Sequence, residues 1–193
     1  MERGKEAMNG TNIEIHRIEP FRVRDVSGAV GRIYRNAYDI PTDEAVRFLS
    51  VAFAKHAMYP GFLLYVATFD GVPAGFIYGY DSRPGQWWHD TIRPAMTEAG
   101  ADSWQDGAFE LAEVAVEPAV QGRGIGTALI KAFLADLAGR TVLLSTSASP
   151  TDRAKDLYRR FGFEDLLPDF RYPGGEDEPA VIMGCKVTRR VHD

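Results

Sequence analysis

One stretch of the chain constrains its fold more than any other. In residues 109–137, which read FELAEVAVEPAVQGRGIGTALIKAFLADL, a glycine-rich loop joins an apolar segment to a helical apolar pattern. Backbone N–H groups at the start of a helix lack partners, and the helix dipole makes that end positive. Glycines at 122, 124 and 126 let the backbone curl closely around an anion. The stretch therefore predicts a phosphate-binding loop between a strand, Phe109–Val116, and a helix.

Three known kinds of phosphate loop compete for this pattern. A Walker loop ends in Gly-Lys-Ser/Thr, whereas this loop ends in Gly-Thr-Ala. The dinucleotide fingerprint Gly-x-Gly-x-x-Gly lacks its third glycine here. The acidic residue expected about 20 positions later is also missing, because Thr146 to Ser149 stand there. The pattern that remains is Gln/Arg-x-x-Gly-x-Gly/Ala, the signature of coenzyme A binding.

Alternating strands and helices are expected along the rest of the chain. The expected strands are residues 12–18, 62–69, 74–80, 109–116, 141–146, 163–167 and 180–187. The expected helices are residues 26–37, a segment from 42 or 43 to 61, a segment from the loop to 139, and a segment from an N-cap at Ser149 to 162. Asp70-Gly71 is a hairpin signal. Residues 81–107 are expected to be irregular. This order predicts one mixed α/β domain over 12–193, after a flexible tail over 1–11.

Composition narrows the class of protein and of partner. The net charge of −5 argues against a nucleic-acid partner, which needs a basic face. Because no apolar run approaches the ~20 residues that span a bilayer, we expect no membrane segment. The first residues, Met-Glu-Arg-Gly-Lys-Glu, are not followed by an apolar stretch, so we expect no secretory signal. The single cysteine, Cys185, is typical of a reducing compartment, so we expect a cytoplasmic protein. No His/Cys/Asp spacing suggests a metal site.

A second motif, Ala-Lys-Asp-Leu-Tyr-Arg-Arg-Phe-Gly-Phe over residues 154–163, follows the loop. With both motifs, residues 109–163 closely resemble the GNAT superfamily of N-acetyltransferases. The resemblance implies the GNAT-like acyl-CoA N-acyltransferase fold: a central, mostly antiparallel sheet with a splayed strand pair, flanked by helices. It implies acetyl-CoA as co-substrate and direct acetyl transfer to an amine of a small molecule or protein. The segment Pro-Gly-Gln-Trp-Trp-His-Asp (84–90) is similar to one in actinobacterial members, from which no substrate follows.

The resemblance also assigns cofactor contacts. The strand backbone that pairs with the pantetheine arm corresponds to Val114, Ala115 and Val116. The pyrophosphate contacts correspond to Gln121, Gly122, Arg123, Gly124, Ile125, Gly126 and Thr127. The family often has an asparagine where this chain has Thr151, whose hydroxyl offers fewer donors to the coenzyme A arm.

Three residues are candidates for proton transfer. Tyr158 matches the family's tyrosine, which resembles a general acid for the leaving thiolate, although its apolar neighbours also fit a core position. Glu110 occupies the position of the glutamate base in histone-acetylating relatives. Glu113 is a second acid on the same strand, and it would point to the opposite face unless a bulge intervenes. A chain of waters is the alternative base.

The sequence says least about the acceptor substrate and the residues that bind it. Trp87, Trp88, His89 and Trp104 lie in the segment that borders the acceptor pocket in relatives, and they could equally form a hydrophobic cluster under a long loop. Three further alternatives stay open: a module that senses acyl-CoA without catalysis, an acyltransferase that uses another acyl donor, and a hydroxyl acceptor. The resemblance also allows a homodimer, since relatives often pair through edge strands.

Overall fold

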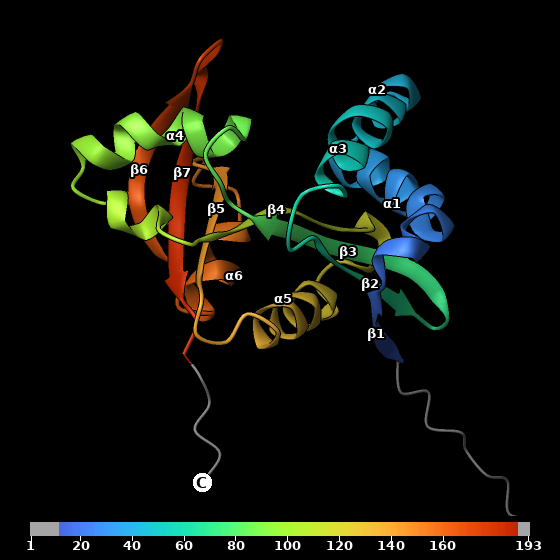
Figure 1. Cartoon of the computed structure of the whole chain (residues 1–193). Helices are drawn as coiled ribbons and strands as arrows, with labels where there is room; N and C mark the ends of the chain where they lie inside the picture. The colour runs from blue at the N-terminus through green and yellow to red at the C-terminus, as the bar shows by residue number, and fades with distance from the viewer. Residues whose placement is uncertain (1–11, 189–193) are drawn as a thin grey trace, which may run out of the picture.

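The computed structural model describes residues 12–188 and contains a seven-stranded sheet with helices on both faces (Figure 1). The strand order is β1-β2-β3-β4-β5-β7-β6. All neighbours pair antiparallel except β4 and β5, which are parallel. The expected tail, residues 1–11, lies outside the described residues. None of the helices within 12–188 is both long and apolar enough to cross a lipid bilayer.

The elements have the following bounds. The strands are β1 Ile13–Ile18, β2 Leu63–Phe69, β3 Val72–Asp81, β4 Phe109–Val116, β5 Thr141–Ser147, β6 Glu164–Tyr172 and β7 Gly175–Lys186. The helices are α1 Val23–Tyr38, α2 Thr42–Arg47, α3 Ala54–His56, α4 Trp87–Glu98, α5 Ile125–Ala135 and α6 Ala154–Arg160. A π-helical stretch, Phe48–Phe53, connects α2 to α3, and short 3-10 turns lie at Pro20–Arg22, Asp102–Gln105 and Pro118–Val120.

Apolar side chains on both faces of the sheet build the core. On one face, α5 and α6 pack against the sheet through a cluster that includes Leu129, Phe133 and Tyr158. On the other face, α1 to α3 cover β2 to β4, while α4 covers β5 to β7. Two separate helical groups therefore lie on the same face, one over each half of the sheet (Figure 1).

The two halves of the sheet meet at a short parallel contact. β4 pairs with β5 only at Phe109 with Val142 and at Glu110 with Leu143. Beyond Glu110, β4 continues to pair with β3 as far as Val116 but no longer with β5. The two strands therefore diverge, as expected from the family resemblance, and the backbone edge of β4 that faces β5 has no sheet partner.

A bulge in β4 sets the direction of its acidic side chains. The register pairs Tyr80 with Glu110 and Tyr78 with Glu113, so three residues of β3 (78–80) face four residues of β4 (110–113), and Ala112 is the extra residue. Tyr78 and Tyr80 are two residues apart and point to one face. Both glutamates therefore point to the face that α1 to α3 cover, although regular alternation would separate them.

Several boundaries differ from the sequence predictions. Residues 81–107, expected to be irregular, contain α4, which includes Pro94 and buries Trp88, Ile92 and Met96. The helix expected from Ser149 begins only at Ala154, whose N–H is bonded by the Asp152 carboxylate at 2.8 Å. The hairpin at Asp70-Gly71 is confirmed, because both residues have positive φ, as a tight turn between β2 and β3 requires.

Candidate active site at the diverging strands

The glycine loop lies between β4 and α5, beside the divergence of the strands. Gly122 and Gly124 have φ of 76° and 90°, a conformation that side-chain-bearing residues rarely adopt. An added Cβ at either position would have no heavy atom within 4 Å, so the outer surface of the loop is open. An added Cβ at Gly126 would lie 3.4 Å from Leu157 Cδ2, an ordinary contact distance, so this glycine lies beside α6 and not on the open surface of the loop.

The main-chain donors of this loop are free. Gln121 N–H donates to Pro118 O, but no hydrogen bond within residues 12–188 uses the N–H groups of residues 122–127. No side chain caps α5, whose N-cap is Gly124. Unpaired donors at the positive end of a helix bind anions well. The Arg123 guanidinium lies 5.4 Å from the centroid of the Phe69 ring. Its positive charge therefore stays beside the loop.

The β4 backbone is partly occupied by its own neighbours. Gln121 Nε2 donates to Val116 O at 3.1 Å, and Val114 N–H donates to the Glu113 carboxylate. Ala115 is buried in the cluster under α1 to α3. Val116 O and Val114 N–H therefore already have hydrogen-bond partners within the chain.

Glu110 lies where β4 and β5 separate, and it is 5% exposed. Its Oε1 accepts a hydrogen bond from the Tyr80 hydroxyl at 2.8 Å, while Oε2 has no partner. Desolvation by burial raises the pKa of Glu110 to about 8, against the smaller lowering effect of the Tyr80 bond. A buried carboxyl with one unpaired oxygen and a pKa near neutrality can exchange a proton with a bound group.

Glu113 has a different environment on the same face. The Tyr38 hydroxyl of α1 donates to Glu113 Oε1 at 2.5 Å. Desolvation raises the pKa of Glu113 to about 7, while the bonds from Tyr38 and Val114 N–H lower it. Glu113 does not line the cavity that Glu110 lines. Of the two acids, Glu110 is thus the one that lines the cavity.

Tyr158 lies in α6, is 5% exposed, and packs with the apolar cluster beneath α5. No hydrogen bond to its hydroxyl is found within residues 12–188. Burial raises its pKa, and the negative charges of Glu113 and Asp152 add to the shift, so the phenol stays protonated at neutral pH. Both expectations for this residue, core packing and an available proton donor, are compatible with this placement.

A cavity of about 350 Å³ opens on the Glu110 side. It is lined from α3 by Lys55 and His56, from the sheet by Tyr80, Glu110, Leu111, Ala112, Ser145 and Tyr172, from the α4 region by Gln86, Trp87 and Trp88, and by Tyr59. These residues come from both halves of the sheet. The cavity therefore depends on the divergence of β4 and β5.

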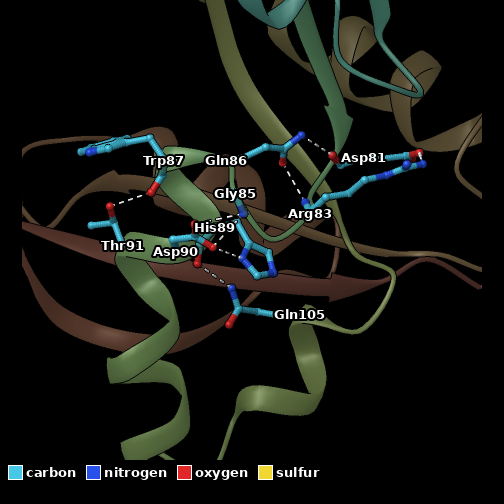
Figure 2. Close-up of polar contacts among 9 residues, drawn as sticks. All are labelled: Asp81, Arg83, Gly85, Gln86, Trp87, His89, Asp90, Thr91 and Gln105. Carbon is cyan, nitrogen blue, oxygen red and sulfur yellow. Dashed lines mark hydrogen bonds and ion pairs between the residues drawn. The ribbon is translucent and has the colours of Figure 1, made fainter.

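The tryptophan segment contributes only some of its expected residues. Trp87 and Trp88 line the cavity, whereas His89 and Trp104 do not. His89 is buried. Its Nδ1 lies 3.0 Å from Asp90 Oδ1, and its carbonyl accepts a bond from Gln105 (Figure 2). Trp104 packs against the α4 cluster and lies 4.6 Å from Lys186 Nζ.

Polar bonds fix the beginning of α4 as a wall of the cavity (Figure 2). The Gln86 side chain accepts from Arg83 N–H at 2.7 Å and donates to Asp81 O at 3.0 Å. The Asp90 carboxylate accepts from Gly85 N–H at 3.0 Å and 3.2 Å. These bonds hold the two tryptophans at the start of the helix in place.

Several lining residues were not anticipated from the sequence. Tyr80 lies two residues from Tyr78 in β3, and this alternation in the sequence does not predict that Tyr80 pairs with Glu110. Lys55, His56 and Tyr59 follow a π-helical stretch, and Tyr172 is the last residue of a strand that is longer than expected.

Thr151 lies in the turn before α6, where its Oγ1 contacts Ser149 Oγ at 2.8 Å. Among residues 12–188, no group of three or more His, Cys, Asp or Glu side chains is arranged to hold a metal ion.

Comparisons with known proteins agree on one family. The family model described as acetyltransferase (GNAT) domain matches residues 60–165. A GCN5-like protein acetyltransferase, Rv2170 of Mycobacterium tuberculosis, is 36% identical over 115 residues. That match covers 56% of this chain and 56% of the relative, so the similarity spans about half of the relative's length.

Solved structures share the fold at low sequence identity. The ribosomal-protein-S18-alanine N-acetyltransferase from Escherichia coli is 19% identical with a TM-score of 0.61, covering 94% of this chain and 98% of that one. A GNAT-family structure from Desulfovibrio desulfuricans, described as a putative acetyltransferase, is 19% identical with a TM-score of 0.65, covering 92% and 100%. At such identities these structures establish the fold alone.

Proposed function

The chain belongs to the GNAT acetyltransferase family, and we propose that it transfers an acetyl group from acetyl-CoA to a primary amine of a small molecule or protein. The observation that carries the proposal is the arrangement around the diverging strands. An open loop with free N–H groups lies on one side, and a buried carboxyl with an unpaired oxygen faces a cavity on the other.

The loop suits a diphosphate. Residues 122–127 present unpaired main-chain donors at the start of α5, and the two glycines with positive φ leave the approach unobstructed. The diverging edge of β4, at Val114, Ala115 and Val116, would lie along the pantetheine arm, and Thr151 would contribute its hydroxyl. When bound, acetyl-CoA supplies an acetyl group activated as a thioester.

Glu110 would act as the general base. An amine is protonated at neutral pH and must lose a proton before it can attack. Glu110 lines the cavity and its buried Oε2 has no hydrogen-bond partner, so an ammonium bound beside the carboxyl would favour its ionised form. Glu113, or a chain of waters, is the second candidate, because Glu113 points to the same face but is bonded to Tyr38.

The transfer is balanced without an acyl-enzyme. The ammonium first gives one proton to Glu110. The neutral amine nitrogen then forms a bond to the acetyl carbon, and the carbon–sulfur bond breaks. The sulfur leaves as a thiolate and takes a proton from the Tyr158 hydroxyl, and the second nitrogen proton returns through solvent to the Tyr158 oxygen. Most of the rate enhancement comes from holding amine and thioester at bonding distance, since both partners lie in one ternary complex.

The test is thiol release from acetyl-CoA with a panel of primary amines, measured beside calorimetric binding of coenzyme A. We expect coenzyme A to bind and at least one amine to accelerate thiol release. Binding without turnover on any amine would refute the transferase and favour a module that senses acyl-CoA. Faster release with a longer acyl-CoA, or with an alcohol acceptor, would correct the donor or the acceptor class.

A further inference from the structure

The residues that line the cavity restrict the chemical class of the acceptor more than membership of the family does. Resting on the proposed acetyltransferase function, we propose that the acceptor is a small aromatic monoamine, with its ammonium at Glu110 and its ring between two aromatic walls. The size of the cavity, its charges and the arrangement of its rings support this acceptor.

The cavity is small. Its volume of about 350 Å³ equals roughly a dozen water molecules at ~30 Å³ each. A compound of one ring and a short amine-bearing chain fills that space. A larger amine would place only one ring or one side chain inside the cavity, with the rest outside its mouth.

The charges of the lining fit one cationic group. Glu110 is the single carboxyl among the lining residues, and its Oε2 is buried without a partner. Lys55 adds a positive charge to the same lining. A first ammonium therefore gains a counter-ion at Glu110, while a second one would meet repulsion from Lys55 and no further carboxylate. Polyamines are accordingly disfavoured.

One wall is formed by rings from the α3 side. The His56 and Tyr80 ring centroids are 4.8 Å apart, and those of Tyr59 and Tyr80 are 4.9 Å apart. Burial and the neighbouring Lys55 lower the pKa of His56 to about 4, so the imidazole is neutral and adds no positive charge. This wall ends at Tyr80, which bonds Glu110 and so links the rings to the carboxyl.

The facing wall comes from α4 and β6. The Trp87 and Tyr172 rings are stacked with centroids 5.7 Å apart at an interplanar angle of 17°, and Trp88 Nε1 donates to the Tyr172 hydroxyl at 2.8 Å. Trp87 is 64% exposed, which places it at the mouth of the cavity. Figure 2 shows its indole pointing away from the polar cluster at the start of α4.

Two aromatic walls around one carboxyl favour a flat ring over an alkyl chain. Ring faces and edges attract a third ring in offset or edge-to-face contact, beyond the gain from apolar burial. The same faces attract an ammonium, so they reinforce the effect of Glu110. A lysine side chain would gain the ammonium contacts and would leave the flat surfaces without a stacking partner.

The experiment compares kcat/KM for acetyl transfer to four amines: 2-phenylethylamine, butylamine, spermidine and a blocked lysine amide. We expect 2-phenylethylamine to exceed each of the others by ~10-fold, the gain from one or two aromatic contacts. Equal or higher kcat/KM with spermidine or with the lysine amide would overturn the aromatic monoamine while leaving the transferase standing.

Two variants test whether the rings of the cavity cause the preference for 2-phenylethylamine. Trp87→Ala removes an exposed ring at the mouth and should lower the preference for 2-phenylethylamine over butylamine several-fold. Phe21→Ala, which removes a ring that is 82% exposed and outside the cavity lining, should leave that preference unchanged. An unchanged preference in Trp87→Ala would contradict the assignment.

A binding measurement separates the two proposals. Calorimetric titration of 2-phenylethylamine in the presence of coenzyme A reports the acceptor site without chemistry. Tight, Trp87-dependent binding with no thiol release on any amine would support the ligand class and refute the transferase. Absence of binding, with turnover of other amines, would refute the ligand class alone.

Discussion

Replacing Glu110 by glutamine perturbs the proposed base while keeping its shape. The Tyr80 hydroxyl can still donate to the amide oxygen, as it does to Glu110 Oε1 at 2.8 Å. The substitution removes only the ability to take up a proton and the cost of a charge in a buried site. It therefore tests the ionisation of Glu110 in two independent ways, through stability and through turnover.

The stability effect follows from the raised pKa. Burial moves the pKa of Glu110 from 4.5 to about 8. Between these values the folded state holds a proton that the unfolded state has lost, so stability falls as pH rises. For this single group the loss between pH 5 and pH 9 is on the order of 4 kcal/mol. Glu110→Gln lacks this contribution, so its free energy of unfolding should depend less on pH over that range.

Turnover should rise with pH over the range in which stability falls. The base is active when ionised, so kcat/KM of the wild type should rise with pH up to about 8. Glu110→Gln should lower kcat/KM by ~10²–10⁴-fold, the range for general-base catalysis. Tyr80→Phe removes a bond that lowers the pKa of Glu110 and should move the inflection to higher pH.

The assay is urea unfolding at pH 5, 7 and 9, with thiol release measured on the same preparations. Glu113 has a raised pKa of its own, and because it is present in both proteins the difference between them isolates Glu110. Glu113→Gln serves as the matched control for turnover, with a smaller effect expected. Parallel stability profiles in wild type and Glu110→Gln, together with retained turnover, would refute the reasoning.

Three further substitutions test other parts of the site. Tyr158→Phe should lower turnover by ~10²-fold with little change in the Kd for acetyl-CoA, and unchanged turnover would remove the phenol from the mechanism. Gly124→Ala (φ 90°) should raise the Kd for coenzyme A, measured by calorimetry, by ~10-fold through lost contacts to charged oxygens. Gly100→Ala (φ 67°) carries similar backbone strain outside the loop and should not change that Kd. Gly79→Ala would place a Cβ 2.1 Å from Glu110 O, so it should cost about 3 kcal/mol in urea unfolding. Gly28→Ala, with no atom within 4 Å of the added Cβ, should be neutral or stabilising, and equal effects of the two would contradict the packing described for β4.

Local pattern predicted most of the fold. β4 has the bounds expected from its apolar run, and the Asp70-Gly71 turn lies where the hairpin signal placed it. The α4 helix was missed because Pro94 and the polar composition outweighed Trp88, Ile92 and Met96, which recur every four residues. Tertiary packing of that apolar stripe against β6 and β7 supplies what local propensity does not.

The residues of the candidate site could be predicted from the sequence only in part. The loop glycines and both acids were identifiable, because their chemistry is tied to a motif and to one strand. That Glu110 and Glu113 share a face depends on a bulge at Ala112, which no residue pattern announces. The aromatic walls join rings from His56 to Tyr172 that only the strand order brings together, so they could not be predicted from sequence spacing.

We propose that the main-chain N–H groups of residues 122–127 hold the diphosphate of coenzyme A. Amide chemical shifts in a titration with coenzyme A measure this directly, residue by residue. We expect large shifts at those amides and along the diverging edge of β4, with small ones in β1 and β7. Saturable binding that leaves the amides of Gly122–Thr127 unmoved would contradict it.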